Sequence, residues 1–150
     1  MKKWIILFAG ILACNFVAFG QLSTGKVQAD SYTEATGRAH SHDEAAAEGG
    51  SCLGYISDGT YAAYKHDFGS GAKLFRINFS SDTKGGSIQI RTGSPSGTLL
   101  GTVQISNTGS WLNYQTRETS IKSTSGVQDL YLIFNGGGGW LFNIAWFETL

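Results

Sequence analysis

Three aromatic side chains stand beside turn sequences rather than within predicted strands. Trp111 follows the turn at residues 107–110, Trp140 follows four consecutive glycines, and Tyr55 precedes the turn at residues 57–59. Exposed Trp and Tyr rings offer flat apolar faces on which the C–H groups of a sugar ring stack, while nearby amides or acids hydrogen-bond its hydroxyls. The alternative is that Trp111 and Trp140 pack over the ends of the hydrophobic core. The sequence leaves both interpretations open.

Catalytic motifs are missing from the sequence. The sequence has no nucleophile elbow of serine hydrolases, no zinc-binding motif of metalloproteases and no phosphate-binding loop of nucleoside triphosphatases. A glycoside hydrolase needs two carboxylates that face each other across the scissile bond. The candidate acids are instead scattered among turns: Asp58, Asp67, Asp82 and Asp129. A small secreted glycosidase that uses an acid such as Asp58 remains an alternative, but no spacing supports it.

One short stretch carries several metal-ligating residue types. His40 and His42 are two residues apart, and Asp43 and Glu44 follow them. In a strand the two imidazoles would point the same way, as zinc ligands do. We favour the other interpretation, in which the stretch is a solvated polar loop. Cys52 has no basic neighbour in sequence, so we expect a small buried side chain rather than a nucleophile.

The elements that must position these residues are predicted to be strands. Residues 74–79, 87–91 and 102–105 alternate apolar and polar side chains, while residues 130–134 form a near-continuous apolar run typical of a strand covered on both faces. A further strand is predicted at residues 142–147, and residues 43–48 form at most one helical turn. The chain has 21 Gly and 15% charged residues, which disfavours a helix bundle. We predict an all-β fold, an antiparallel β-sandwich.

The N-terminus has the pattern of a secretory signal peptide. Two lysines precede an apolar run at residues 4–13, and the small residues Ala18 and Gly20 fit a cleavage site before Gln21. We therefore divide the chain into a signal peptide at residues 1–20, a short leader at 21–26 and one domain at 27–150. The alternative is a lipoprotein sequence, in which a lipid on Cys14 would anchor a surface-adhesion module. Cleavage after residue 20 would leave Cys52 without an intramolecular disulfide partner.

The charge balance excludes one broad class of partner. The chain has 11 Lys and Arg against 11 Asp and Glu, and removal of Lys2 and Lys3 leaves a slight acidic excess. Nucleic acids and anionic membranes attract proteins through excess positive charge. The composition therefore gives no electrostatic reason to expect either, and it fits a neutral ligand better than a polyanion.

Six segments of the chain, taken together, resemble one protein family. They are residues 27–32 (VQADSY), 53–61 (LGYISDGTY), 94–101 (SPSGTLLG), 107–114 (NTGSWLNY), 126–132 (GVQDLYL) and 141–147 (LFNIAWF). In this order they are similar to the successive motifs of carbohydrate-binding module family 6. Each motif alone is weakly specific, whereas all six in family order are specific. The resemblance runs from about residue 27 to residue 150.

The resemblance implies a jelly-roll β-sandwich that binds glycans without cleaving them. It places Tyr55 and Trp111 as two aromatic walls around a sugar ring, and Asn143 as a hydrogen-bonding partner of the hydroxyls. Trp140 would add a third wall. A second cleft, on the concave face of some members, would use Tyr61. The implied ligand is a β-linked polysaccharide such as xylan or β-glucan, and such modules commonly accompany a linked catalytic domain.

Two departures from the family pattern affect what the chain binds. Residues 38–42 stand where the family often carries Gln or Glu as a polar contact to the sugar, so that contact is either lost or supplied by a different group. The family's structural calcium would involve Gln28 and Asp30. Ala145, however, replaces an aspartate of that site. Because calcium needs several oxygen ligands, we expect a weak site or none.

Overall fold

The computed structural model describes residues 25–150. The predicted signal peptide and Cys14 therefore lie outside the described residues. The described chain is built from strands and connecting loops. The strands are β1 (Val27–Gln28), β2 (Glu34–Ala35), β3 (His40–Asp43), β4 (Ser51–Gly54), β5 (Tyr61–Asp67), β6 (Ala72–Ser81), β7 (Gly86–Thr92), β8 (Thr98–Ile105), β9 (Ser110–Thr124), β10 (Val127–Gly136) and β11 (Asn143–Thr149).

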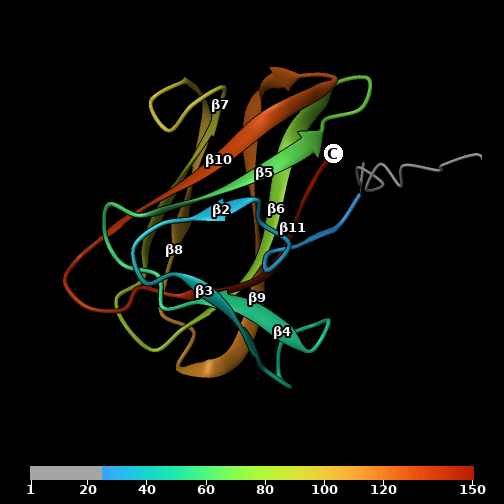
Figure 1. Cartoon of the computed structure of the whole chain (residues 1–150). Helices are drawn as coiled ribbons and strands as arrows, with labels where there is room; N and C mark the ends of the chain where they lie inside the picture. Colours follow the sequence, from blue (N-terminus) through green and yellow to red (C-terminus); the bar gives the residue numbers. More distant parts are fainter. Residues whose placement is uncertain (1–24) are drawn as a thin grey trace, which may run out of the picture.

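The strands form two antiparallel sheets that pack face to face (Figure 1). One sheet has the order β3-β4-β11-β6-β9, with β1 also paired to β11, and the other has the order β2-β5-β10-β7-β8. From β4 to β11, every connection except the one between β7 and β8 crosses to the opposite sheet. This strand order is a jelly roll. The predicted fold class, an antiparallel β-sandwich with jelly-roll topology, is confirmed.

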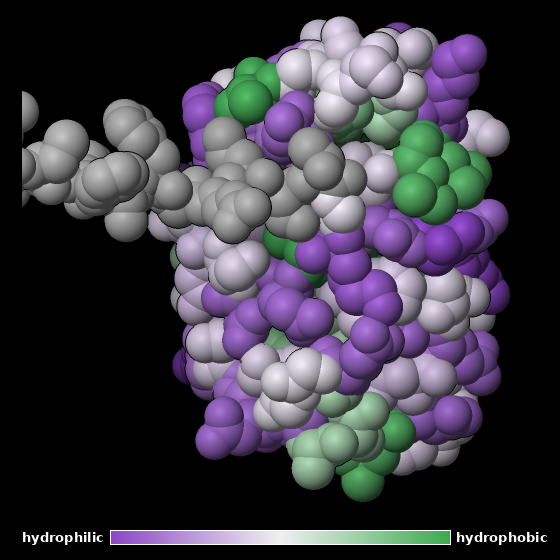
Figure 2. Space-filling model, turned by 90° about the vertical axis from the view of Figure 1, so that its right-hand side faces the viewer, coloured by the Kyte–Doolittle hydropathy of each residue, from purple (hydrophilic) through white to green (hydrophobic). Residues whose placement is uncertain are grey.

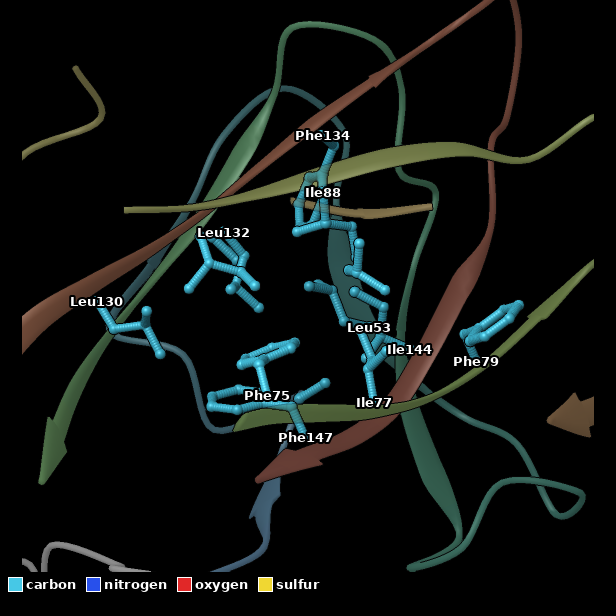
Figure 3. Close-up of a cluster of buried hydrophobic side chains, with 14 of the residues drawn as sticks. Leu53, Phe75, Ile77, Phe79, Ile88, Leu130, Leu132, Phe134, Ile144 and Phe147 are labelled. Atoms are coloured by element: carbon cyan, nitrogen blue, oxygen red, sulfur yellow. The ribbon is translucent and has the colours of Figure 1, made fainter. Parts of the chain in front are cut away.

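The core lies between the sheets, and the alternation in β6 shows how the sequence builds it. Phe75, Ile77 and Phe79 are at most 1% exposed, whereas Arg76 and Asn78 are half-buried on the outer face. Successive side chains of a strand point to opposite faces, so one apolar set enters the core. Figure 3 shows these three side chains among the buried apolar cluster to which both sheets contribute. Each buried side chain of this size contributes roughly 1.5–3 kcal/mol to folding.

The strand whose two faces are both buried is β11. The sequence analysis predicted this instead for residues 130–134, which lie in β10. Residues 130–134 do form part of a strand, but Tyr131 and Ile133 are only half-buried on its outer face. In β11, Ile144 and Phe147 enter the main core, while Ala145 and Trp146 join a second buried cluster. That cluster exists because the loop between β3 and β4 contributes Ala47 to it. The two-sided prediction for residues 130–134 is therefore wrong, since no such cover lies over Tyr131.

The outer surface of the described residues is mostly polar on the side shown in Figure 2. Within residues 25–150, no helix is long and apolar enough to cross a membrane. Figure 2 shows one side of the molecule, on which hydrophilic residues predominate and apolar residues form separate spots. The part of this side that grey atoms leave uncovered has no continuous apolar area of the kind that marks a large interface.

Candidate functional site

A cleft of about 220 Å³ lies at one end of the sandwich. The end of β4 meets the beginnings of β9 and β11 there. This follows from the antiparallel pairing of β11 with β4 and β6, and of β6 with β9. Three aromatic rings, one imidazole, one amide and one carboxylate line it: Tyr55, Trp111, Trp140, His42, Asn143 and Glu44. Its size is below the ~300–1,000 Å³ of pockets that enclose a drug-sized ligand, so it suits a small part of a long molecule.

Tyr55 is held in an uncommon backbone conformation. Among residues 25–150 it is the one non-glycine residue with a positive φ, 55°. A left-handed conformation costs a non-glycine residue roughly 1–2 kcal/mol, and such residues persist where their surroundings fix them. The imidazole of His40 stacks on the Tyr55 ring, with centroids 4.4 Å apart and planes within 8°. Trp140 meets the same ring edge-on at 5.5 Å and 89°.

The loop that carries Trp140 is anchored at both ends. At its start, the amide of Gly136 donates to the Asp58 carboxylate at 2.9 Å. At its end, the amide of Leu141 donates to the carbonyl of Ile56, also at 2.9 Å. The second bond fixes the residue after Trp140 to the residue after Tyr55, so the two rings meet. Asp58, the acid considered for hydrolysis, therefore has a structural partner and does not line the cleft.

Hydrogen bonds from buried hydroxyl groups hold the backbone at and before Trp111 in position. The hydroxyl of Ser80, in β6, donates to the backbone carbonyl of Trp111 at 2.6 Å. In the preceding turn, the Thr108 hydroxyl accepts the amide proton of Ser81 at 2.9 Å, and both Ser80 and Ser81 are fully buried. The beginning of β9 is thus tied to the end of β6 by side chains as well as by the sheet.

Asn143 is the first residue of β11 and is 8% exposed. It lies opposite Ser80 in the β6–β11 pair, just before an irregularity in register between Ile144 and Trp146. Such bulges redirect side chains near functional sites. The neighbouring Gly54 leaves room for it, because a Cβ there would lie 2.9 Å from the Asn143 Oδ1 and still closer to the ring of His42.

His42 and Glu44 are cleft residues that the sequence analysis placed elsewhere. Residues 40–43 form strand β3, paired with β4, and not the polar loop that we favoured. His40 and His42 do share one face, as the spacing of two predicts, but both contact the Tyr55 ring. Within residues 25–150, no three or more His, Cys, Asp or Glu side chains are grouped to hold a metal. Of residues 38–42, His42 is the one that lines the cleft.

Cys52 lies beneath the cleft. It is fully buried, as predicted, and its Sγ is 3.4 Å from the Nε2 of His42. Burial raises the pKa of the Cys52 thiol above its usual range. A thiol that resists deprotonation is a poor nucleophile, so the contact orients the His42 ring rather than forming a catalytic pair.

The residues at the expected calcium position can be satisfied by hydrogen bonds within the protein. With its amide oriented to satisfy both its oxygen and its nitrogen, the Nε2 of Gln28 donates to the carbonyls of Glu48 (3.0 Å) and Ala145 (3.2 Å). Asp30 accepts the Ser51 hydroxyl proton at 2.5 Å. In this orientation the amide nitrogen faces both carbonyl oxygens. The two carboxylates nearby, Asp30 and Glu48, each already accept hydrogen bonds from protein groups.

Glu48, in the loop between β3 and β4, also connects that loop to β11. The carboxylate of Glu48 accepts hydrogen bonds from the Lys26 ammonium (2.6 Å) and from the indole N–H of Trp146 (2.9 Å). The Lys26 ammonium also lies 4.1 Å from the centre of the Trp146 ring. The hydrogen bond from Lys26 holds the pKa of Glu48 below its usual range. Lys26, placed in the predicted leader, therefore contacts the folded domain.

Tyr61 lies outside the cleft. It belongs to β5 in the five-stranded sheet, where its hydroxyl donates to Glu34 at 2.9 Å and its ring meets that of Tyr131 edge-on at 5.7 Å. The structure thus brings together Tyr55, Trp111, Trp140 and Asn143 and leaves Tyr61 apart. A site at Tyr61 would be a separate one.

Comparisons with known proteins place the whole described domain in one family. The model of the carbohydrate binding module (family 6) matches residues 28–149. An endo-1,4-beta-xylanase A of Thermoclostridium stercorarium is 48% identical over 85 residues, which are 56% of this chain and 16% of that protein. An arabinoxylan arabinofuranohydrolase of Paenibacillus polymyxa is 40% identical over 95 residues, 61% of this chain and 15% of that protein. The chain thus spans about a sixth of these relatives.

Solved structures agree in fold. A family 6 carbohydrate-binding module from Clostridium cellulolyticum, solved in complex with xylose, has a TM-score of 0.77 and 34% identity, covering 83% of this chain and 95% of that one. A β-1,3-glucan-binding module of the same family from Bacillus halodurans has a TM-score of 0.75 and 38% identity, covering 83% and 93%. The family is a non-catalytic one. With its jelly roll, its motif order and this match over nearly all described residues, the chain belongs to carbohydrate-binding module family 6.

Proposed function

We propose that this chain binds a β-linked polysaccharide, such as xylan or a β-glucan, in the cleft at the end of the sandwich. The observation that carries the proposal is the convergence of Tyr55, Trp111 and Trp140 around Asn143. Sugar rings combine an apolar C–H face with a rim of hydroxyls, so they need both kinds of group in one place. The aromatic rings supply the stacking surface.

The polar groups of the cleft give the proposal its chemical detail. The Asn143 amide both donates and accepts, the Glu44 carboxylate accepts, and the His42 imidazole does either according to its tautomer. Together they match sugar hydroxyls, each of which donates one proton and accepts others. A neutral ligand also agrees with the single carboxylate and the absence of Lys or Arg among the lining residues.

The relatives support the choice of polysaccharide class. Solved relatives bind xylose, cellobiose and β-1,3-glucan, and the sequence relatives act on xylan or arabinoxylan by name. We propose that the chain acts outside the cell, where such polymers occur, as the signal-peptide pattern at residues 1–20 predicts. A linked catalytic domain in a longer protein would place the module as its targeting part.

Hydrolysis by this chain is not supported. Of the described residues that line the cleft, only Glu44 carries a carboxylate, whereas glycoside hydrolysis in most families uses two. Long incubation with xylan and β-glucan should therefore release no reducing ends. Release that is lost on changing Glu44 to Gln would contradict this.

Affinity gel electrophoresis against xylan, cellulose derivatives and β-1,3-glucan tests the binding proposal. Wild type should be retarded by at least one polymer, and Trp111→Ala should weaken binding at least ~30-fold, as for a central aromatic contact. Leu112→Ala is the matched control, because Leu112 is the next residue of β9, is 58% exposed and does not line the cleft. No retardation of wild type, or equal retardation of Trp111→Ala, would refute the proposal.

Two further variants test the remaining alternatives, a second binding surface at Tyr61 and a lipid anchor at Cys14. Residual binding by Trp111→Ala that disappears in the double variant with Tyr61→Ala would assign a second binding surface to the five-stranded sheet.

The lipid-anchor alternative predicts that Cys14→Ser moves the protein from the membrane fraction to the soluble fraction. Unchanged partitioning would exclude that anchor.

A further inference from the structure

His40 has a geometry that the family motifs do not explain. It lies in β3 directly opposite Gly54, the residue before Tyr55. Its ring is nearly parallel to the Tyr55 ring, at 8°, with centroids 4.4 Å apart. Parallel overlap at this distance is a stacked contact over one face of the tyrosine. His40 itself is exposed and is not among the residues that line the cleft.

A hydrogen bond to the backbone fixes the orientation of the His40 ring. Its Nδ1 lies 2.8 Å from the carbonyl oxygen of Arg38. A carbonyl can only accept, so Nδ1 carries the proton and donates it. The ring is therefore held both by this hydrogen bond and by its place in a paired strand, and it forms a rigid backing.

We infer that His40 is a positioning residue that holds Tyr55 as a one-sided platform for the sugar. Its imidazole covers the face of Tyr55 that points away from the cleft and leaves the opposite face for the ligand. Trp140 and His42 meet the ring at its edges, at 5.5 Å and 5.3 Å, so rotation of Tyr55 is opposed on three sides. This inference rests on the proposed function, because it assigns Tyr55 to the ligand.

The energetic consequence follows from preorganisation. A side chain that is already fixed in its binding orientation loses little freedom when the ligand arrives, whereas a mobile one must be ordered. Loss of the backing ring should therefore weaken binding without removing any direct contact to the sugar. We expect His40→Ala to bind about 3- to 10-fold more weakly than wild type, with the loss appearing in the binding entropy.

Three variants separate stacking from hydrogen bonding. His40→Phe keeps a ring without its nitrogens, and His40→Asn keeps a hydrogen-bond donor without the ring. Titration calorimetry with xylohexaose, cellohexaose and a β-1,3-linked glucohexaose should give near wild-type affinity for His40→Phe and weak binding for His40→Ala and His40→Asn. The reverse order, or wild-type affinity of His40→Ala, would overturn the inference. Equal melting temperatures of the variants confirm that each is folded.

A measurement without ligand keeps this inference separate from the proposed function. NMR relaxation of a ring-labelled Tyr55 should show a rigid side chain in wild type and in His40→Phe, and a more mobile one in His40→Ala. Equal mobility in all three would overturn the positioning role. Failure of wild type to bind any of the three oligosaccharides, with the mobility difference present, would instead refute the choice of ligand.

Discussion

The hydroxyl of Ser80 donates a hydrogen bond to the backbone carbonyl of Trp111 at 2.6 Å. Ser80 also lies opposite Asn143 in the β6–β11 pair. One buried serine thus connects the strand that carries the cleft tryptophan with the strand that carries the cleft asparagine. Trp111 and Asn143, two residues that line the cleft, are therefore positioned by the same short stretch of β6.

Replacement of Ser80 by Ala should therefore affect binding more than a buried serine ordinarily would. The Trp111 carbonyl would lose its side-chain donor, at a cost in stability of about 1 kcal/mol. We expect a several-fold loss of affinity for the bound oligosaccharide by calorimetry, together with a small decrease in the free energy of unfolding. The dependence would be disproved by a variant that loses stability while its affinity stays at the wild-type value.

Gly54→Ala tests the close approach of the polar side chains. A Cβ at this position would lie 2.9 Å from the Asn143 Oδ1 and would also overlap the His42 ring. Real Cβ atoms do not come so close to other atoms, so one or both side chains must move. Binding should decrease in this variant. Gly137→Ala is the control, since a Cβ there meets nothing within 4 Å, and equal binding by the two variants would contradict the expectation.

Gln28 gives a prediction about calcium. With its amide oriented to satisfy both of its polar atoms, Gln28 donates to the Glu48 and Ala145 carbonyls, so the melting temperature of wild type should be the same in EDTA and in millimolar calcium. Gln28→Ala should lower the free energy of unfolding by about 1 kcal/mol, as expected for lost hydrogen bonds. A rise of several degrees in the wild-type melting temperature on adding calcium would show that the site does bind the ion.

His66 predicts how stability changes with pH. It is 1% exposed, its Nε2 lies 2.8 Å from the Thr149 hydroxyl oxygen, and burial lowers the pKa of His66 to about 4. The unfolded chain takes up a proton near pH 6.5, whereas the native protein does so only near pH 4. The free energy of unfolding should thus decrease as the pH falls from 6.5 to 4, by up to about 3 kcal/mol from this group.

The His66→Gln variant isolates that contribution. Urea denaturation of both proteins at pH 7.5, 5.5 and 4.5 should give a shallower pH dependence for the variant, even where its stability at pH 7.5 is lower. Carboxylates titrate in the same range and contribute to both proteins equally, so they cancel in the difference. Parallel pH profiles for the two proteins would show that His66 is not the group responsible.

The sequence predicts the scaffold better than the contacts within the cleft. The alternation of Phe75, Ile77 and Phe79 is a local property, and the structure has the strand that it predicts. Two-sided burial of β11 depends on the β3–β4 loop that covers it, and no pattern within residues 142–147 reveals that loop. The apolar run at residues 130–134 misled for the same reason.

The histidines show where residue types alone are ambiguous. A pair such as His40 and His42 serves equally in a metal site, a polar loop or an aromatic stack, because imidazole is a ligand, a donor and a ring. The pairing of β3 with β4 decides between them by bringing both rings to Tyr55. The sequence alone predicted only that His40 and His42, two residues apart, would lie on the same face of a strand. Gln28 is similar, since its role depends on carbonyls far away in sequence.

The loop that carries Trp140 is fastened at Gly136 and at Leu141, and the glycines between them touch little else. The length and sequence of residues 137–140 can therefore vary without disturbing either sheet, because the two anchored residues stay in place. Longer surface loops cost little additional closure entropy. Ligand preference can therefore diversify here during evolution while the jelly roll stays the same.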